Sequence, residues 1–433
     1  MIGRLVIDRT KTRPAVLTSA WIESAAKWLT PRRIRAHATI LALCLWGVCA
    51  IDFATPGLFD RAANIKFQDF LPLYVSAQLI AQHRALELYD QQVMAESIHT
   101  IVGQPTRVRL PNLYGPQVGL FFVLLTRFSF PTAARIWVAA SLLVFVGCVL
   151  LIWKSGSILR LHFASVAICA LAFPPLFHFF ARGQMSALVL ACFTLAFLAF
   201  RADRSLLAGV ALGFLVFKPQ FLIAIPLVLL LSQAWKAFAG LVISAAAQLA
   251  FTRIYFGPAV THAYFNTLWH VSRVIDAAEL PNAPLQIHSL RSFWSLLIAW
   301  PEAALLLYGL SSVVIVGMAA AAWKSSSPLA LRFSALTLAA VLVNPHLFIY
   351  DLLVLAPALL LLVEWTLTNP QHPSSAALKL LTYLAFILPL FGPLSRWTHV
   401  QLSVPVFTVL LWVLWHHSRT PSHKLASNES GVV

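Results

Sequence analysis

Residues 136–153 read IWVAASLLVFVGCVLLIW, an apolar run that contains no charged residue. An α-helix needs about 20 apolar residues to cross the hydrocarbon core of a bilayer, so this stretch predicts a membrane-spanning helix. A transmembrane β-barrel would instead show segments of roughly 10 residues with alternating polarity. The run therefore indicates a helical membrane protein.

The same pattern recurs along the chain. Hydrophobic residues make up 60% of the 433 residues and charged residues only 11%, whereas about 25% of a soluble domain is charged. Mean hydropathy is +0.80. Further apolar segments lie at 36–53, 161–178, 184–200, 206–217, 220–232, 237–255, 302–323, 329–345, 347–365, 378–394 and 400–416. We therefore predict an all-α, polytopic membrane helix bundle of about twelve spans, formed by residues 36–416.

The chain is strongly basic, with a formal net charge of +16. Many of these positive charges precede the first apolar segment, as expected on the cytoplasmic side of a membrane protein. We therefore predict a basic cytoplasmic segment at 1–35, a cytoplasmic tail at 417–433, and a location in the cell membrane. This placement of charge predicts membrane lipids as partners and argues against nucleic acid.

The loops 154–160, 201–205, 233–236 and 324–328 each carry Lys or Arg. The positive-inside rule places them all in the cytoplasm if residues 115–127 dip into the membrane or lie on it. If that short segment crosses the membrane, these basic loops no longer all fall on the cytoplasmic side. We therefore favour the arrangement in which residues 115–127 do not cross. Long outer loops then lie at 54–135 and 256–301. Residues 74–94 mix aliphatic and polar side chains, which predicts an interfacial helix in the membrane plane.

Asp69 is the most informative side chain of the first outer loop, in the stretch KFQDFLPLY at 66–74. A carboxylate just outside the first span could act as a general base toward a substrate hydroxyl. Its aromatic and apolar neighbours would limit its hydration and tune its basicity. The alternative is a solvated loop acid, or an ion-pair partner of Lys66 or Arg61. Charge alone does not decide between them.

Other polar candidates fall on the same predicted face. Lys218 ends an apolar helix just before Pro219, and it either snorkels to the interface or binds a phosphate as a point charge. His346, in NPHLFIYD at 344–351, is either a structural residue or a ligand. Asp351 is an acid inside a predicted span, a position that is usually functional or paired. Further candidates, each of which could be an ordinary loop residue, are Arg182, Gln184 and His270.

Several motifs are missing from the sequence. It contains no Walker loop, no GxGxxG after a strand, no HExxH and no Asp-x-Asp pair of the kind that holds a divalent ion. We therefore expect no metal ion, no cofactor and no soluble nucleotide-binding domain. A substrate carried on a lipid suits an outward site at membrane level better than a nucleotide does.

The order of short motifs gives the strongest family signal. They are Asp69-Phe70 with Tyr74, Leu88-Tyr89, Leu113-Tyr114-Gly115-Pro116, Phe173-Pro174-Pro175, Gly183-Gln184, Phe217-Lys218-Pro219, and Asn344-Pro345-His346 with Tyr350-Asp351. In this order the chain resembles glycosyltransferase family 87 over residues 36–365. The family has the C-type multi-span glycosyltransferase fold and uses sugars carried on polyprenyl phosphate. Tyr114-Gly115-Pro116 stands where Tyr-Pro-Pro is expected, which leaves the acceptor and the sugar open.

The resemblance implies transfer of mannose or a similar sugar from a polyprenyl-phosphate donor to a lipid or glycan acceptor on the outer face, with inversion. It implies that Asp69 is the base. Predicted binding residues, with phosphate contact assigned first to Lys218 and His346, are Lys218, His346, Gln184, Arg182, His270 and Tyr74. The rival interpretations are a secondary transporter or lipid-linked flippase, and a non-catalytic assembly factor. A transporter would place its polar residues at mid-membrane on broken helices, whereas here they gather at one face.

Overall fold

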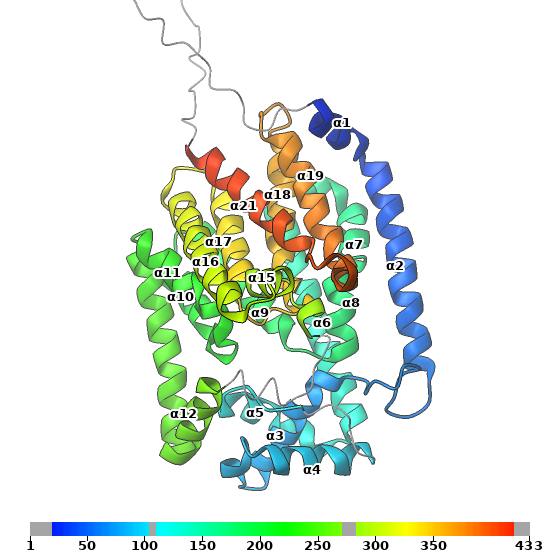
Figure 1. The fold of residues 1–433 in the computed structure, drawn as a ribbon, viewed down its shortest axis with the longest axis vertical. Helices are drawn as coiled ribbons and strands as arrows, with labels where there is room; N and C mark the ends of the chain where they lie inside the picture. Colours follow the sequence, from blue (N-terminus) through cyan, green and yellow to red (C-terminus); the bar gives the residue numbers. More distant parts are fainter. Residues whose placement is uncertain (1–19, 104–109, 271–282, 420–433) are drawn as a thin grey trace, which may run out of the picture.

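The computed structural model describes residues 20–103, 110–270 and 283–419. Across these ranges the chain is helical (Figure 1) and has no β-strand beyond two isolated bridges, Phe59–Ile65 and Ile287–Phe348. The all-α prediction is confirmed. The longer helices are α2 (Pro31–Ala54), α6 (Phe130–Ser155), α9 (Ser186–Arg201), α12 (Trp235–Trp269), α16 (Pro301–Lys324), α17 (Leu329–Val343), α18 (Leu355–Thr368), α19 (Ser375–Ile387) and α21 (Ser403–Arg419).

Six of the described helices are long and apolar enough to cross a membrane, at Pro31–Ala54, Phe130–Ser155, Trp235–Trp269, Pro301–Lys324, Ile349–Thr368 and Ser375–Thr398. A seventh is possible if α7 (Phe163–Leu171), with the turn that precedes it, and α8 (Pro174–Arg182) act as one span bent by 51°. Other predicted segments form shorter apolar helices, such as α9. The predicted count of about twelve spans is therefore not confirmed, because helices of 10–17 residues are shorter than the roughly 20 needed to span alone.

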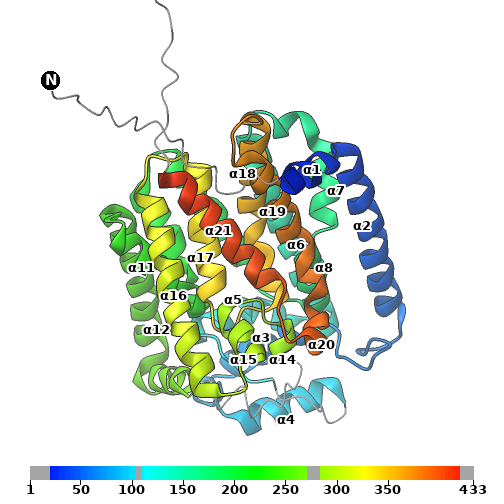
Figure 2. The same ribbon diagram turned by 45° about the horizontal axis from the view of Figure 1, so that its top comes forward.

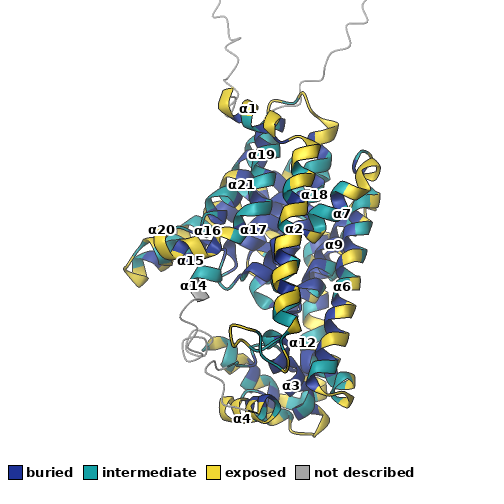
Figure 3. Ribbon diagram, turned by 90° about the vertical axis from the view of Figure 1, so that its right-hand side faces the viewer, coloured by how far each residue is buried: buried dark blue, intermediate teal, exposed yellow. Residues whose placement is uncertain are grey.

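The core of the bundle lies around α17 and residues 349–368. From Phe333 to Val343 every residue of α17 is buried, and a helix that is apolar all round belongs in an interior. It packs against α16, α18 and α21. In Figure 2 α21 crosses the face of the bundle beside α17 and α19. Figure 3 shows the opposite case in α2, which is exposed along most of its length and is suited to face lipid.

Short helices lie across one end of the bundle. Figure 1 places α3 (Leu71–Ala81) and α4 (Gln91–Val102) there, and places α1 (Ala20–Trp28) and the last turn of α21 at the other end. The single interfacial helix predicted at 74–94 is wrong in extent, because α3 ends at Ala81 and His83 adopts a left-handed conformation (φ 59). α3 is also largely buried. The amphipathic surface belongs to α4, which buries Met94, Ile98 and Val102.

The predicted outer loop 256–301 begins as helix. α12 continues to Trp269 across a kink at Gly257, whose φ of 81° is left-handed and suits glycine, and Pro258 follows. After the gap in the described residues come α14 (Ala283–Gln286) and α15 (Leu290–Leu297). The Gly-Pro pair therefore ends one helical stretch at the kink, and a second helical stretch follows it to Trp269.

Glycines allow α10 (Ser205–Gly213) to pack backbone to backbone against α12. A β-carbon added to Gly209 would overlap the carbonyl oxygen of Ala237, and one added to Gly240 would overlap that of Leu206. Small residues at such crossings let membrane helices approach closely. This contact matters for the site because the chain runs from α10 through the 3₁₀ turn Phe214–Phe217 directly to Lys218.

We expect Gly209→Ala to lower stability by at least the ~1–3 kcal/mol typical of overpacking, because the obstructing atom is backbone and cannot rotate away. Thermal unfolding of the detergent-purified protein measures the effect. Gly147→Ala on α6 is the matched control, since nothing lies within 4 Å of its added β-carbon. Equal melting temperatures for the two variants would contradict the tight α10–α12 crossing.

Candidate active site

Asp69 lies in a short 3₁₀ turn (Gln68–Phe70, η1) that is held against the end of α8. Phe67, just before the turn, is left-handed (φ 57), an unusual conformation for a bulky residue. Its amide donates to the carbonyl of Ala181 at 3.2 Å. Gly183, also left-handed (φ 68), ends α8, and a β-carbon there would approach Phe70 Cβ to 3.1 Å. Glycine at 183 therefore lets α8 and the Asp69 turn meet.

The polar partners of Asp69 flank that glycine. Arg182 Nη1 lies 3.9 Å from Asp69 Oδ1, and Gln184 Nε2 donates to Oδ2 at 3.3 Å. The hydroxyl of Tyr350 also donates to the carboxylate. Burial nevertheless raises the pKa of Asp69 above its ordinary value, and Arg182, Tyr350, Gln184 and Lys218 offset that rise only in part. The side chain remains 15% exposed, so a substrate hydroxyl can reach it.

Neither cation suggested by the alternative interpretation of Asp69 pairs with it. Arg61 forms an ion pair with Asp52 at 2.6 Å. Lys66 Nζ donates to backbone oxygens, including that of Thr55 at 2.5 Å. The ion-pair partner is instead Arg182, which is more than 100 positions along the chain.

Gln184 is oriented by two donors. Its Oε1 accepts from the Tyr114 hydroxyl at 2.9 Å and from the Met185 amide at 2.8 Å. An amide oxygen occupied in this way directs the Nε2 group to Asp69. Burial raises the pKa of Tyr114, so its hydroxyl stays protonated and available as the donor. Tyr114 and Gln184 therefore hold one face of the carboxylate.

Lys218 and Asp351 form a buried ion pair beneath this site. Lys218 Nζ lies 2.5 Å from Asp351 Oδ1, and each side chain is only 2% exposed. Ser186 Oγ donates to the same oxygen at 2.8 Å. Lys218 was expected to bind phosphate as a point charge, but in the structure Asp351 already occupies its ammonium group.

Tyr350 joins the ion pair to the acid. Its ring centroid lies 5.6 Å from Lys218 Nζ and it stacks on Phe348 at 5.5 Å, while its hydroxyl bonds to Asp69. Tyr350 and Asp351 are neighbours in the 3₁₀ segment Ile349–Val354 (η7), which packs on α8 and α9. One segment therefore contacts both the carboxylate and the lysine.

The family model of glycosyltransferase family 87 matches residues 112–345 of the 433-residue chain. The chain belongs to glycosyltransferase family 87. No curated protein and no solved structure matched it. The matched range contains Tyr114, Arg182, Gln184 and Lys218, whereas Asp69 precedes it and Asp351 follows it. We include these two acids in the candidate site because Asp69 contacts Gln184 and Asp351 contacts Lys218, both of which lie in the matched range.

The remaining predicted binding residues of this glycosyltransferase make other contacts. His346 Nε2 accepts from Arg291 Nη1 on α15 at 3.2 Å. Tyr74 is buried and donates its hydroxyl to the carbonyl of Phe128 at 2.7 Å. His270 bonds through Nδ1 to the carbonyl of Asn266 at 3.0 Å at the end of α12. Among the described residues, the side chains of Tyr74 and His270 thus hydrogen-bond to backbone oxygens and not to Asp69 or its partners.

Sequence reasoning did not single out Tyr114 and Tyr350, which contact Gln184 and Asp69, or Arg291, the partner of His346. Tyr114 and Tyr350 both belong to motifs quoted above, beside Gly115-Pro116 and Asp351, so a signal for them existed. Arg291 had none. Within the described ranges, no group of three or more His, Cys, Asp or Glu side chains is arranged to hold a metal ion.

Proposed function

We propose that the chain is a membrane glycosyltransferase that moves a sugar, mannose or similar, from a polyprenyl-phosphate donor to a lipid or glycan acceptor, with Asp69 as the general base. The observation that carries the proposal is the position of Asp69. It is a partly exposed carboxylate whose pKa is raised by burial and which Gln184, Tyr350 and Arg182 orient, in a family-87 glycosyltransferase. A base with a raised pKa is better matched to proton transfer near neutral pH.

The proposed step is an inverting displacement. The ionised Asp69 takes the proton of the acceptor hydroxyl, while the oxygen of that hydroxyl forms a bond to the anomeric carbon. The bond from that carbon to the phosphate oxygen breaks, and polyprenyl phosphate leaves with the electron pair. Arg182, 34% exposed, is placed to stabilise the growing negative charge on the phosphate. We propose that His346 and Arg291 extend this phosphate-binding surface.

The proposed orientation follows from charge. Lys154, Arg201 and Lys324 lie in the last turns of α6, α9 and α16, and positively charged ends of spans stay on the cytoplasmic side. We therefore propose cytoplasmic segments at 1–35 and 417–433, a catalytic domain at 36–416, and Asp69 on the outer face of the cell membrane. A donor carried on lipid then reaches the site from the bilayer, and the acceptor from outside.

Release of polyprenyl phosphate from a radiolabelled donor tests the proposal. The wild-type protein in liposomes is given polyprenyl-phosphate mannose and then the corresponding arabinose donor, each with extracted membrane glycolipids as acceptor. Transfer of label to the acceptor supports the enzyme. Movement of intact labelled donor between leaflets without cleavage would instead establish the flippase interpretation.

Arg182 also sets the pH dependence of the proposed reaction. Because its charge lowers the pKa of Asp69, Arg182→Gln is expected to raise that pKa further. The base works only when ionised, so activity is present above this pKa and is lost as pH falls through it. The acid limb of kcat/KM should therefore move to higher pH in Arg182→Gln. Arg135→Gln, at the exposed start of α6, should leave the limb in place; a limb that moves to lower pH in Arg182→Gln would contradict the assignment.

A further inference from the structure

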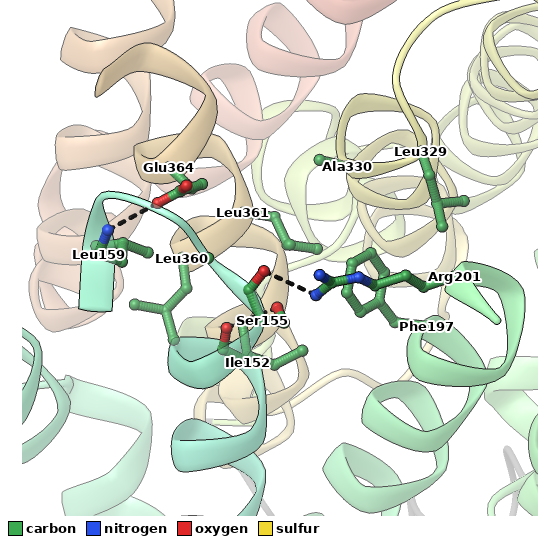
Figure 4. A pocket seen from close by; sticks show the side chains of 11 residues that line it. Ile152, Ser155, Leu159, Phe197, Arg201, Leu329, Ala330, Leu360, Leu361 and Glu364 are labelled. Carbon is green, nitrogen blue, oxygen red and sulfur yellow. Dashed lines mark hydrogen bonds between the residues drawn. The ribbon is translucent and has the colours of Figure 1, made fainter. Parts of the chain in front are cut away.

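A cavity lies at the end of the bundle opposite Asp69. It has a volume of about 220 Å³ and sits between α6, α9, α17 and α18 (Figure 4). At the Asp69 end, Trp137 of α6 donates to the carbonyl of Gly183, and α9 begins at Ser186. The two helices end at this cavity with Ser155 and Arg201. Its lining is mainly apolar and consists of Ile152, Leu159, Phe197, Leu329, Leu360 and Leu361, with Ala330, Gly156, Ser155, Arg201 and Glu364.

One wall of the cavity is held by Glu364. Its carboxylate accepts hydrogen bonds from the backbone amides of Ser157 (2.6 Å), Ile158 (3.1 Å) and Leu159 (2.8 Å), and from the Ser157 hydroxyl (2.7 Å). These bonds tie the loop after α6 to α18. The acceptor capacity of Glu364 is thus used within the chain, and the apolar interior stays open between the tied elements.

Arg201 lies at the rim of the cavity. One guanidinium nitrogen, Nη1, donates to the carbonyl of Ser155 at 2.7 Å, and Figure 4 shows the side chain extending toward Ser155. Three more cations, Lys154, Arg160 and Arg204, lie in the neighbouring segments of the chain, together with the acids Asp203 and Glu364. The local net charge is positive, because these three residues and Arg201 make four cations against two acids.

The place of the cavity in the membrane follows from the spans that border it. The candidate spans Phe130–Ser155 and Ile349–Thr368 both end near it. The ends of membrane spans lie at the level of the lipid headgroups, where Arg side chains meet lipid phosphates. The cavity therefore offers apolar surface below that level and a cation at it.

We propose that this cavity binds one acyl chain of an anionic phospholipid, with Arg201 contacting the headgroup phosphate. The volume favours this occupant. Sites that enclose a whole small ligand measure about 300–1,000 Å³, so 220 Å³ accommodates only part of a ligand whose remainder lies outside. An acyl chain with its headgroup at the rim meets both the size and the charge. The proposal is independent of the glycosyl transfer described above.

Thermal unfolding with added lipid tests the site. The full chain, stripped of lipid in a neutral detergent, is titrated with phosphatidylglycerol and with phosphatidylcholine of the same acyl chains. Phosphatidylglycerol should raise the melting temperature more than phosphatidylcholine does. Arg201→Gln should weaken the phosphatidylglycerol response about fivefold in concentration, as expected for one basic residue at an anionic surface. Ala330→Phe, which fills the cavity without a change of charge, should abolish the preference.

Arg135→Gln is the matched control, because Arg135 is likewise exposed and donates to a backbone carbonyl, that of Pro131 at 3.0 Å, but at the other end of α6. It should keep the wild-type response. Equal stabilisation by the two lipids would overturn the proposal, as would an equal shift with inorganic phosphate alone. An unchanged response in both Arg201→Gln and Ala330→Phe would also overturn it. Melting temperatures without lipid show whether each variant is folded, and native mass spectrometry counts bound lipid in any variant whose melting is altered.

Discussion

Asp69→Asn is expected to lower sugar transfer by about 10²–10⁴-fold, the usual loss when a general base is removed. Asn keeps the size of the side chain and can still accept a hydrogen bond from Tyr350 or Gln184, so the local fold should persist. Burial raises the pKa of Asp69, which means that the folded state disfavours the ionised carboxylate. The neutral variant should consequently melt no lower than the wild type at neutral pH. The measurement is the initial rate of polyprenyl-phosphate release, alongside the melting temperature.

Asp90→Asn is the matched control for this experiment. Asp90 lies in the same stretch between the first two long helices, and its carboxylate caps α4 by accepting from the amides of Gln92 and Val93. Asparagine caps helices about as well as aspartate, so this variant should retain both activity and stability. Transfer that survives in Asp69→Asn would remove Asp69 from the role of base, even if the chain proves to be a glycosyltransferase with another donor.

Asp351→Asn is expected to destabilise the protein by about 3–5 kcal/mol, because it leaves the Lys218 ammonium buried without its counter-ion. Both side chains of the pair are only 2% exposed, so water cannot replace the lost carboxylate. Lys218→Met should be similarly damaging, since it leaves Asp351 unpaired. The double variant Lys218→Met/Asp351→Asn should recover most of the loss, because replacing both charges of a buried pair is often neutral or stabilising. Unfolding in detergent–denaturant mixtures measures the cycle.

An exposed ion pair provides the comparison. Arg61 and Asp52 approach to 2.6 Å, but their side chains are 53% and 23% exposed, and such pairs contribute about 0–1 kcal/mol. Asp52→Asn should therefore have little effect. Additive losses in the Lys218/Asp351 cycle would show that the two residues do not stabilise each other, contrary to the structure. Sugar transfer can also be measured in the folded double variant, because Tyr350 contacts both Lys218 and Asp69.

Local sequence predicted the helices well. The apolar segments 136–153 and 302–323 lie inside α6 and α16, because burying backbone hydrogen bonds in lipid requires a helix wherever the chain is apolar for long enough. Outside these long apolar runs, sequence reasoning was less successful. The predicted loop from residue 256 contains a second helical stretch after the break at Gly257, and residues 74–94 indicated one helix where the chain turns at His83. Neighbouring helices decide whether such a break is bridged.

By itself the sequence determined the class of the protein and its candidate chemistry: a helical membrane bundle with an acid after the first span, in the motif order of glycosyltransferase family 87. Those properties depend on hydrophobic length and on residue type, which are local. The tertiary structure alone decided the partners. Gln184 reaches Asp69 across 115 positions and Lys218 reaches Asp351 across 133, and the packing of α8, α9 and α10 brings them together. The sequence does not indicate which residue a charged side chain will pair with, because burial and distance are set only when the helices pack.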